Sequence, residues 1–148
     1  MRTVRRGLTY FAAAVALLTT GFAVSASSAE TWEASIMRGL PVYSATQDGG
    51  KVVIVCDPDR VYNPDRNAGN IVVTMPTDRS ARELVFLSST GTQAAFEVRD
   101  GVATSMAARP GQWDALREIV EQGGQFAVVT ARDRFVLDME PMPDFNCR

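Results

Sequence analysis

Apolar and polar residues alternate along most of this chain, which is the pattern of β-strands that bury one face. In the last such segment Phe135 and Leu137 take one face and Asp138 takes the other, so the sheet there has one dry and one wet side. About eight short strands are predicted, drawn from the segments 31–37, 40–44, 51–56, 70–75, 84–88, 94–99, 102–106, 125–130 and 134–140.

Two of these segments carry a further signal about their place in a sheet. Pro41 has no N–H to give to a ladder, so the segment 40–44 is predicted to be a short edge strand. Residues 51–56 form an almost uninterrupted apolar run. Such a run predicts a strand that is covered on both faces.

The residues from 84 to 106 predict a three-stranded meander. A loop containing Gly91 joins the first two strands, and Asp100-Gly101 joins the second to the third. Asp-Gly is typical of a two-residue type I′ turn between antiparallel strands. We therefore expect the strand at 102–106 to pair with the strand at 94–99.

One segment has helical periodicity. The apolar residues of 112–122 recur on one face, and the segment is bounded by Pro110-Gly111 and Gly123-Gly124. This pattern predicts one amphipathic helix that ends at the paired glycines. Many short strands with a single helix predict a mainly β fold, either an antiparallel β-sandwich or a partly open barrel, with the helix closing one end.

Residues 1–29 have the three parts of a secretory signal peptide. Three arginines precede an apolar core, Phe11–Leu18, and small residues follow. This order predicts cleavage after Ala29, or after Ala26 as the alternative. The apolar core is too short for a membrane span of roughly 20 residues. We therefore expect 30–148 to be a single extracytoplasmic domain, periplasmic or secreted, with no stable membrane anchor.

Charge must be counted on the mature chain. Loss of the leader leaves 12 basic residues against 17 acidic ones, a net charge of −5. That balance argues against nucleic acid and anionic membrane surfaces as partners. The pair Arg5-Arg6 resembles the start of a twin-arginine signal, but the fuller motif is poor and nothing indicates a cofactor that is loaded before export. The general secretory route and no cofactor are therefore expected.

The chain has two cysteines, Cys56 and Cys147. In an oxidising compartment two thiols in one small domain usually pair, and this bond would fix the tail to a central strand. Closing a loop of roughly 90 residues stabilises by up to about 4–5 kcal/mol in the chain-entropy model. An intermolecular bond through the tail is the competing interpretation. The intrachain bond agrees with the monomer that we expect.

The chain contains no histidine. That excludes Ser-His-Asp and Cys-His catalysis and nearly all catalytic zinc sites. An acid-type hydrolase would need paired carboxylates, for which Asp57 with Asp59, or Asp133 with Asp138, are the candidates. Charged residues beside turns are ordinarily solvated, so we expect no enzyme.

The densest polar segment, 57–70, joins two predicted strands. Its acids and amides are ligand types that calcium prefers. An EF-hand register from Asn63, however, puts Ala68 where glycine is needed and Thr74 where the bidentate glutamate should be. The sequence therefore favours a solvated loop, stiffened by two prolines, without a metal.

This long loop is also the first candidate for a binding surface, because ordered loops often carry function. Tyrosine and arginine are the residue types that dominate interface energetics. The loop holds both, and we predict a binding site at Arg60, Tyr62, Asp65 and Arg66.

Four features follow one another along the mature chain at a spacing that is found in a known family. Trp32 follows the leader, a strand ends in Cys56, the segment Leu116–Val129 joins a helix to a strand, and Cys147 lies near the end. In this spacing the chain resembles the invasion-associated locus B family, small β-rich periplasmic proteins of α-proteobacteria linked to host-cell entry. Those proteins typically carry two cysteine pairs, and their closing segment is replaced here by the stretch 141–145. The resemblance implies a periplasmic β-rich domain and assigns no functional residue.

These features together predict an exported, non-enzymatic module that binds a protein or another component of the bacterial envelope. A structural accessory subunit of an envelope assembly is the first alternative, and an acid-type hydrolase is the second. A large apolar surface patch would favour the subunit. A pocket that holds two carboxylates with raised pKa values would favour the hydrolase.

We expect mature protein from the producing cells to begin at Glu30, or at Ser27 if cleavage follows Ala26. The reason is that signal peptidase accepts small residues at these two positions. Intact-mass measurement of the extracytoplasmic fraction distinguishes the two sites. Recovery of the chain with Met1 in a membrane fraction would contradict export.

Overall fold

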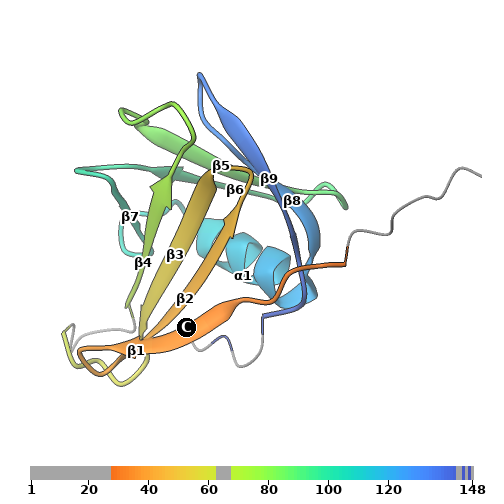
Figure 1. The fold of residues 1–148 in the computed structure, drawn as a ribbon. Helices are drawn as coiled ribbons and strands as arrows, with labels where there is room; N and C mark the ends of the chain where they lie inside the picture. Colours follow the sequence, from red (N-terminus) through yellow and green to blue (C-terminus); the bar gives the residue numbers. More distant parts are fainter. Residues whose placement is uncertain (1–27, 63–67, 143–144, 146, 148) are drawn as a thin grey trace, which may run out of the picture.

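The computed structural model describes residues 28–62, 68–142, 145 and 147. In these residues nine strands form two antiparallel sheets, with one helix between them (Figure 1). The first sheet has the order β1 (Glu33–Met37), β2 (Leu40–Gln47), β3 (Gly50–Asp57), β4 (Ala68–Thr74) and β7 (Val102–Thr104). The second has the order β6 (Gln93–Glu97), β5 (Glu83–Ser88), β8 (Gly124–Val129) and β9 (Arg134–Met139), and the helix α1 spans Gln112–Gln122. The predicted β-sandwich is confirmed, and the sheets do not close into a barrel.

The core lies between the two sheets and is built from alternate positions of their strands. Val52 and Ile54 of β3 face inward and are fully buried. In the second sheet the ring of Phe86 lies 6.1 Å from that of Phe96 and 6.4 Å from that of Phe126, measured between centroids. Because alternate residues of each strand face the opposite sheet, the period-two pattern of the sequence supplies this core.

The helix predicted over 112–122 is confirmed, and its apolar face is buried. It packs mainly against β6, where the Trp113 ring meets Phe96 edge-on at 6.0 Å. A methyl group at Gly69 of β4 would overlap the Trp113 ring. The helix therefore reaches the first sheet at a position where the strand has no side chain.

The predicted disulfide bond between Cys56 and Cys147 is present and joins the C-terminal tail to the end of β3. The carbonyl of Cys147 also accepts a 3.2 Å hydrogen bond from the Trp113 indole. Earlier in the tail, Phe145 packs edge-on against Tyr43 of β2 at 5.9 Å. The tail thus covers one side of the core through covalent, polar and apolar contacts.

The predicted meander is wrong in its last strand. β5 and β6 pair as expected, and Asp100-Gly101 forms the expected turn, with φ of 52° and 80°. After one isolated bridge across this turn, however, the chain moves to the other sheet, where β7 pairs with β4. The move places Ala103 in the core, where it is fully buried. The turn chemistry fixed the reversal of the chain but not the sheet that the next strand joins.

The prediction of an edge strand at 40–44 is also wrong. β2 is an eight-residue strand that lies between β1 and β3. The ladder to β3 begins at the pair Val42–Val55, one residue after Pro41. The missing N–H of this proline therefore leaves no ladder position unpaired.

β3 differs from its prediction on one face. Its inward residues are buried, as expected for an apolar run. Its outward residues Val53 and Val55 are only partly buried, so the strand is not covered on both faces by the described residues. The outer face of the first sheet consequently carries accessible valines among its polar residues.

Replacing Cys147 with serine is expected to lower the free energy of unfolding by about 2–4 kcal/mol, because the unfolded chain regains the entropy of an open loop. The measurement is thermal or denaturant unfolding followed by circular dichroism. Wild-type protein in reductant serves as the control and should show a similar loss. An unchanged melting temperature in both samples would contradict a stabilising role for the bond.

Candidate functional site

One buried carboxylate organises the described part of the loop that follows β3, residues 58–62. Asp57 is only 5% exposed, and its two oxygens accept hydrogen bonds from the amides of Val61 and Tyr62 at 2.7 and 2.8 Å. Its carbonyl accepts a further bond from the Arg60 amide at 3.3 Å. Asp57, one of the predicted hydrolase acids, therefore holds the loop in shape.

Tyr62 borders a hollow on the outer face of the five-stranded sheet, which we call the Tyr62 hollow. The Tyr62 hydroxyl donates a 3.3 Å hydrogen bond to the carbonyl of Arg38 in the β1–β2 turn. The hollow measures about 450 Å³ and its lining is mainly apolar. Its walls include Met37, Leu40, Val55, Tyr62, Asn70 and Met106. These residues form a site suited to an apolar side chain with a polar neighbour.

The apolar surface continues beyond this hollow. Val53 and Val55 of β3 are partly buried on the outer face, and Val72 of β4, which pairs with Val53, is 39% exposed. Six of the seven large apolar side chains that are exposed in the described residues lie on or beside this sheet, with Ile36 on the face of Tyr43 and not on the outer face. The six are Ile36, Met37, Val61, Tyr62, Val72 and Met106. Apolar side chains gathered on one sheet are typical of an interaction surface.

The four residues predicted as the binding site fall into two groups. Tyr62 lines the hollow, and Arg60 is exposed on the same loop with a positive φ of 58°. Asp65 and Arg66 lie outside the described residues. The structure therefore places Tyr62 at a candidate site and Arg60 beside it.

Sequence reasoning missed the sheet residues that share the hollow with Tyr62. Met37 and Val55 come from β1 and β3, and Met106 follows β7. A signal for Val55 was present in the apolar run 51–56, because alternate residues of a strand face opposite sides and Val53 and Val55 therefore face outward. Because the run 51–56 was expected to be covered on both faces, its outward residues were not considered as part of a binding surface.

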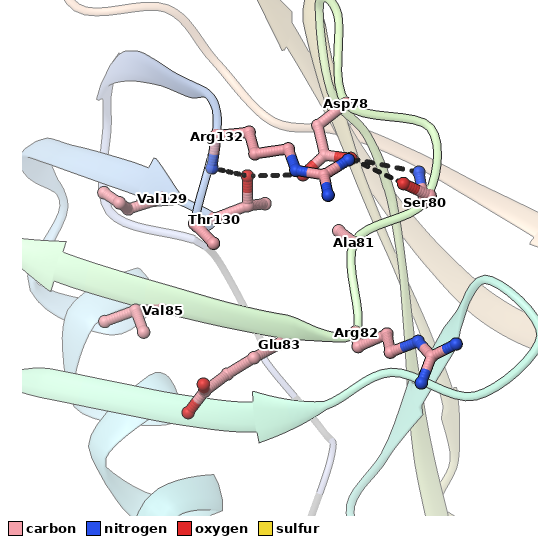
Figure 2. Close-up of a pocket in the computed structure, with 10 residues that line it drawn as sticks. Asp78, Ser80, Ala81, Arg82, Glu83, Val85, Val129, Thr130 and Arg132 are labelled. Carbon is pink, nitrogen blue, oxygen red and sulfur yellow. Dashed lines mark hydrogen bonds between the residues drawn. The ribbon is translucent and has the colours of Figure 1, made fainter.

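A second hollow, of about 650 Å³, lies between the loop after β4 and the turn between β8 and β9 (Figure 2). One oxygen of Asp78 accepts hydrogen bonds from the amide and hydroxyl of Ser80, at 3.1 and 3.2 Å. The other accepts a bond from the Thr130 hydroxyl at 2.9 Å. Arg132 extends toward Asp78, whereas Arg82 points away from it (Figure 2). These contacts, the Ser80 amide first, lower the pKa of Asp78.

Asp133 ties the same two loops together. One of its oxygens accepts bonds from the amide and hydroxyl of Thr77 at 2.6 and 2.8 Å and from the Asp78 amide at 3.1 Å. The other accepts the Arg134 amide at 2.8 Å. These bonds, led by the Thr77 amide, lower the pKa of Asp133. A general acid needs a raised pKa, so the shifts of Asp78 and Asp133 both run opposite to that requirement.

Within the described ranges, no three histidine, cysteine, aspartate or glutamate side chains gather as a set of metal ligands. No helix in that part of the chain is long and apolar enough to cross a membrane. No protein-family model, curated protein or solved structure matches this chain. The fold and the surfaces around the two hollows are therefore the features that indicate a function.

Replacing Asp133 with asparagine is expected to lower the melting temperature at pH 7, because a charged acceptor of four hydrogen bonds is lost. The pKa of Asp133 in the folded protein lies below its ordinary value of 3.8. Its contribution to stability is therefore present above that value and is lost as the pH falls through the folded pKa. The difference between wild type and variant should shrink below about pH 4.

Calorimetric melts between pH 7 and pH 2 measure this difference. Asp100→Asn, in the exposed β6–β7 turn, controls for the loss of one negative charge. A difference between wild type and Asp133→Asn that stays constant over the whole range would contradict a role for the carboxylate charge.

Proposed function

We propose that this protein is an exported, non-enzymatic module that binds a protein partner through the outer face of its five-stranded sheet. The observation that carries the proposal is the Tyr62 hollow, with the apolar surface that surrounds it. A hollow of about 450 Å³ accepts one or two large side chains. A protein partner fits better than a small polar ligand, because the lining of the hollow is mainly apolar and accessible valines of β3 and β4 lie on the same face.

The geometry of Tyr62 supports this role. Tyr62 is 62% exposed, yet the Asp57 carboxylate holds its backbone amide and its hydroxyl binds the Arg38 carbonyl. A side chain that is exposed but already held loses little conformational entropy when a partner binds. Held aromatic residues beside an apolar pocket are typical of the residues that dominate binding energy.

Export to the periplasm or to the outside of the cell belongs to the same proposal. The signal peptide expected at 1–29 supports it, and so does the bond between Cys56 and Cys147, since such bonds persist in oxidising compartments. A place in the invasion-associated locus B family is proposed on residue spacing alone. The partner would then be a protein of the envelope or of its surroundings.

A structural subunit of an envelope assembly is the second candidate. The concentration of exposed apolar side chains on one sheet favours it, because permanent interfaces are more apolar than transient ones. The two candidate functions differ in the lifetime of the complex with the partner. A permanent subunit would stay with its assembly through purification, whereas a recognition module would be recovered alone.

Photo-crosslinking in the producing cells tests the proposed surface. A photoreactive residue at Tyr62 or Met106 is expected to give one defined protein adduct, because both positions border the hollow. The matched control is Leu87, which is 43% exposed and lies on the other sheet. We expect no adduct there. Adducts of equal yield at all three positions, or at Leu87 alone, would contradict binding through the five-stranded sheet.

A further inference from the structure

The two sheets have four edge strands, which differ in how well their free backbone groups are protected from pairing with another chain. The amide of Ala95 in the edge strand β6 donates a 2.6 Å hydrogen bond to the side chain of Gln112 in α1. At the edge strand β9, the Asp138 amide donates to Gln47 at 2.8 Å, and Glu30 bonds to the backbone of Asp138 and Glu140 at 2.7 Å. β7 is only three residues long. Short or capped edges resist pairing with other chains.

The fourth edge, β1, has neither protection. All five of its residues are exposed, and in the described part of the chain it pairs only with β2 (Figure 1). Its residues 33–37 contain no proline, lysine or arginine, which are the residues that commonly block an edge. Ile36 is instead 78% exposed and Met37 54% exposed. β1 is therefore the edge that remains able to accept another strand.

The β1–β2 turn fixes which backbone groups are available. Arg38 and Gly39 have φ of 52° and 82°, as in a two-residue type I′ turn. In such a hairpin the residues that flank the turn form a hydrogen-bonded pair. Along the ladder from there, non-hydrogen-bonded and hydrogen-bonded pairs alternate. The amides and carbonyls of Ala34 and Ile36 consequently point away from β2. The pairing of Ile36 with Pro41, which has no N–H, agrees with this register.

We propose that β1 takes up an extended segment of the partner polypeptide as a sixth, antiparallel strand. This inference rests on the proposed function and names how the partner is bound. Unpaired peptide groups at strand spacing are complementary to the backbone of another extended chain, which is the basis of β-strand addition. Antiparallel addition continues the pattern of the whole sheet.

The side chains beside β1 define what the segment should carry. Glu33 lies near one end of β1 on the outer face, where it accepts a 3.3 Å bond from Ser44. Glu30 and Glu140 are exposed nearby, and in the described residues none of these three carboxylates forms an ion pair. At the other end Met37 borders the Tyr62 hollow. An antiparallel segment would therefore carry an apolar residue beside Met37 and a basic residue four positions later, beside Glu33.

A second copy of this chain fits the same edge less well. Antiparallel pairing of β1 with itself, centred on Ser35, would place Glu33 beside Met37 of the copy. The acidic end would then gain no opposite charge. The acidic patch and the apolar hollow together favour a different polypeptide with a basic residue in its strand.

A synthetic peptide tests strand addition directly. The probe is the seven-residue peptide Thr-Leu-Val-Thr-Val-Arg-Thr with blocked ends, which places Leu beside Met37 and Arg beside Glu33. We expect binding to slow hydrogen exchange at the amides of Ala34 and Ile36. The same peptide with both Val amides N-methylated should bind at least tenfold more weakly, because it keeps its side chains but loses two donors.

Variants of the edge complete the test. Ala34→Pro removes an outward N–H that β2 does not use, and proline is tolerated at such edge positions. It should weaken peptide binding at least tenfold, while Ala34→Val, which keeps the amide, should stay within about twofold. Glu33→Lys should weaken the Arg peptide several-fold, and a peptide with Glu in place of Arg should restore binding.

Three results would overturn strand addition. They are equal binding of the methylated peptide to wild-type protein, exchange protection confined to strands other than β1, and a dimer of the free protein joined through β1. The first result needs no variant, so misfolding of Ala34→Pro cannot obscure the outcome. If crosslinks at Tyr62 persist in a folded Ala34→Pro variant, the proposed function stands and strand addition fails. If the Tyr62 crosslinks are lost in Ala34→Pro but retained in Ala34→Val, both the proposed function and strand addition are supported.

Discussion

The bond between Cys56 and Cys147 is made where β3 leaves the core, and most of the candidate surface depends on that junction. On the inner side it holds the tail against the sandwich, so that Phe145 can cover Tyr43. On the outer side the next residue, Asp57, turns the chain and sets the direction of Tyr62. One covalent constraint therefore stabilises the core and positions the loop beside the hollow.

Local signals predicted most of the fold. The helix, its end at Gly123-Gly124 and the last hairpin follow from spacing and turn chemistry, and each is found where it was expected. The place of β7 did not follow, because Asp100-Gly101 specifies a reversal and the choice of sheet depends on where Ala103 is buried. The position of β2 failed for a related reason, since Pro41 lies one residue outside the ladder to β3.

The candidate site was predictable only in part. Tyr62 was found because its residue type and its loop suggested binding. Met37 and Val55 were not found, because nothing local distinguishes an outward apolar residue that stays accessible from one that is covered by its own chain. The difference is set by the tertiary structure, in which the two sheets bury only one face of β3.

Two surfaces with different physical roles meet at the end of β1. The outer sheet face offers apolar area, which gives affinity without direction. The edge of β1 offers peptide groups, which give direction and register at a smaller gain in free energy. A partner that used both would be oriented by its backbone and retained by its side chains. The polar hollow around Asp78 is different, because its carboxylate is already engaged by neighbouring loops.

Hydrogen–deuterium exchange on the complex with the protein that a photoreactive residue at Tyr62 captures tests the central claim most directly. The account predicts that bound partner slows exchange in β1 and in the loop around Tyr62, and leaves the second sheet, β5, β6, β8 and β9, unchanged. Protection confined to the second sheet would contradict recognition through the five-stranded sheet.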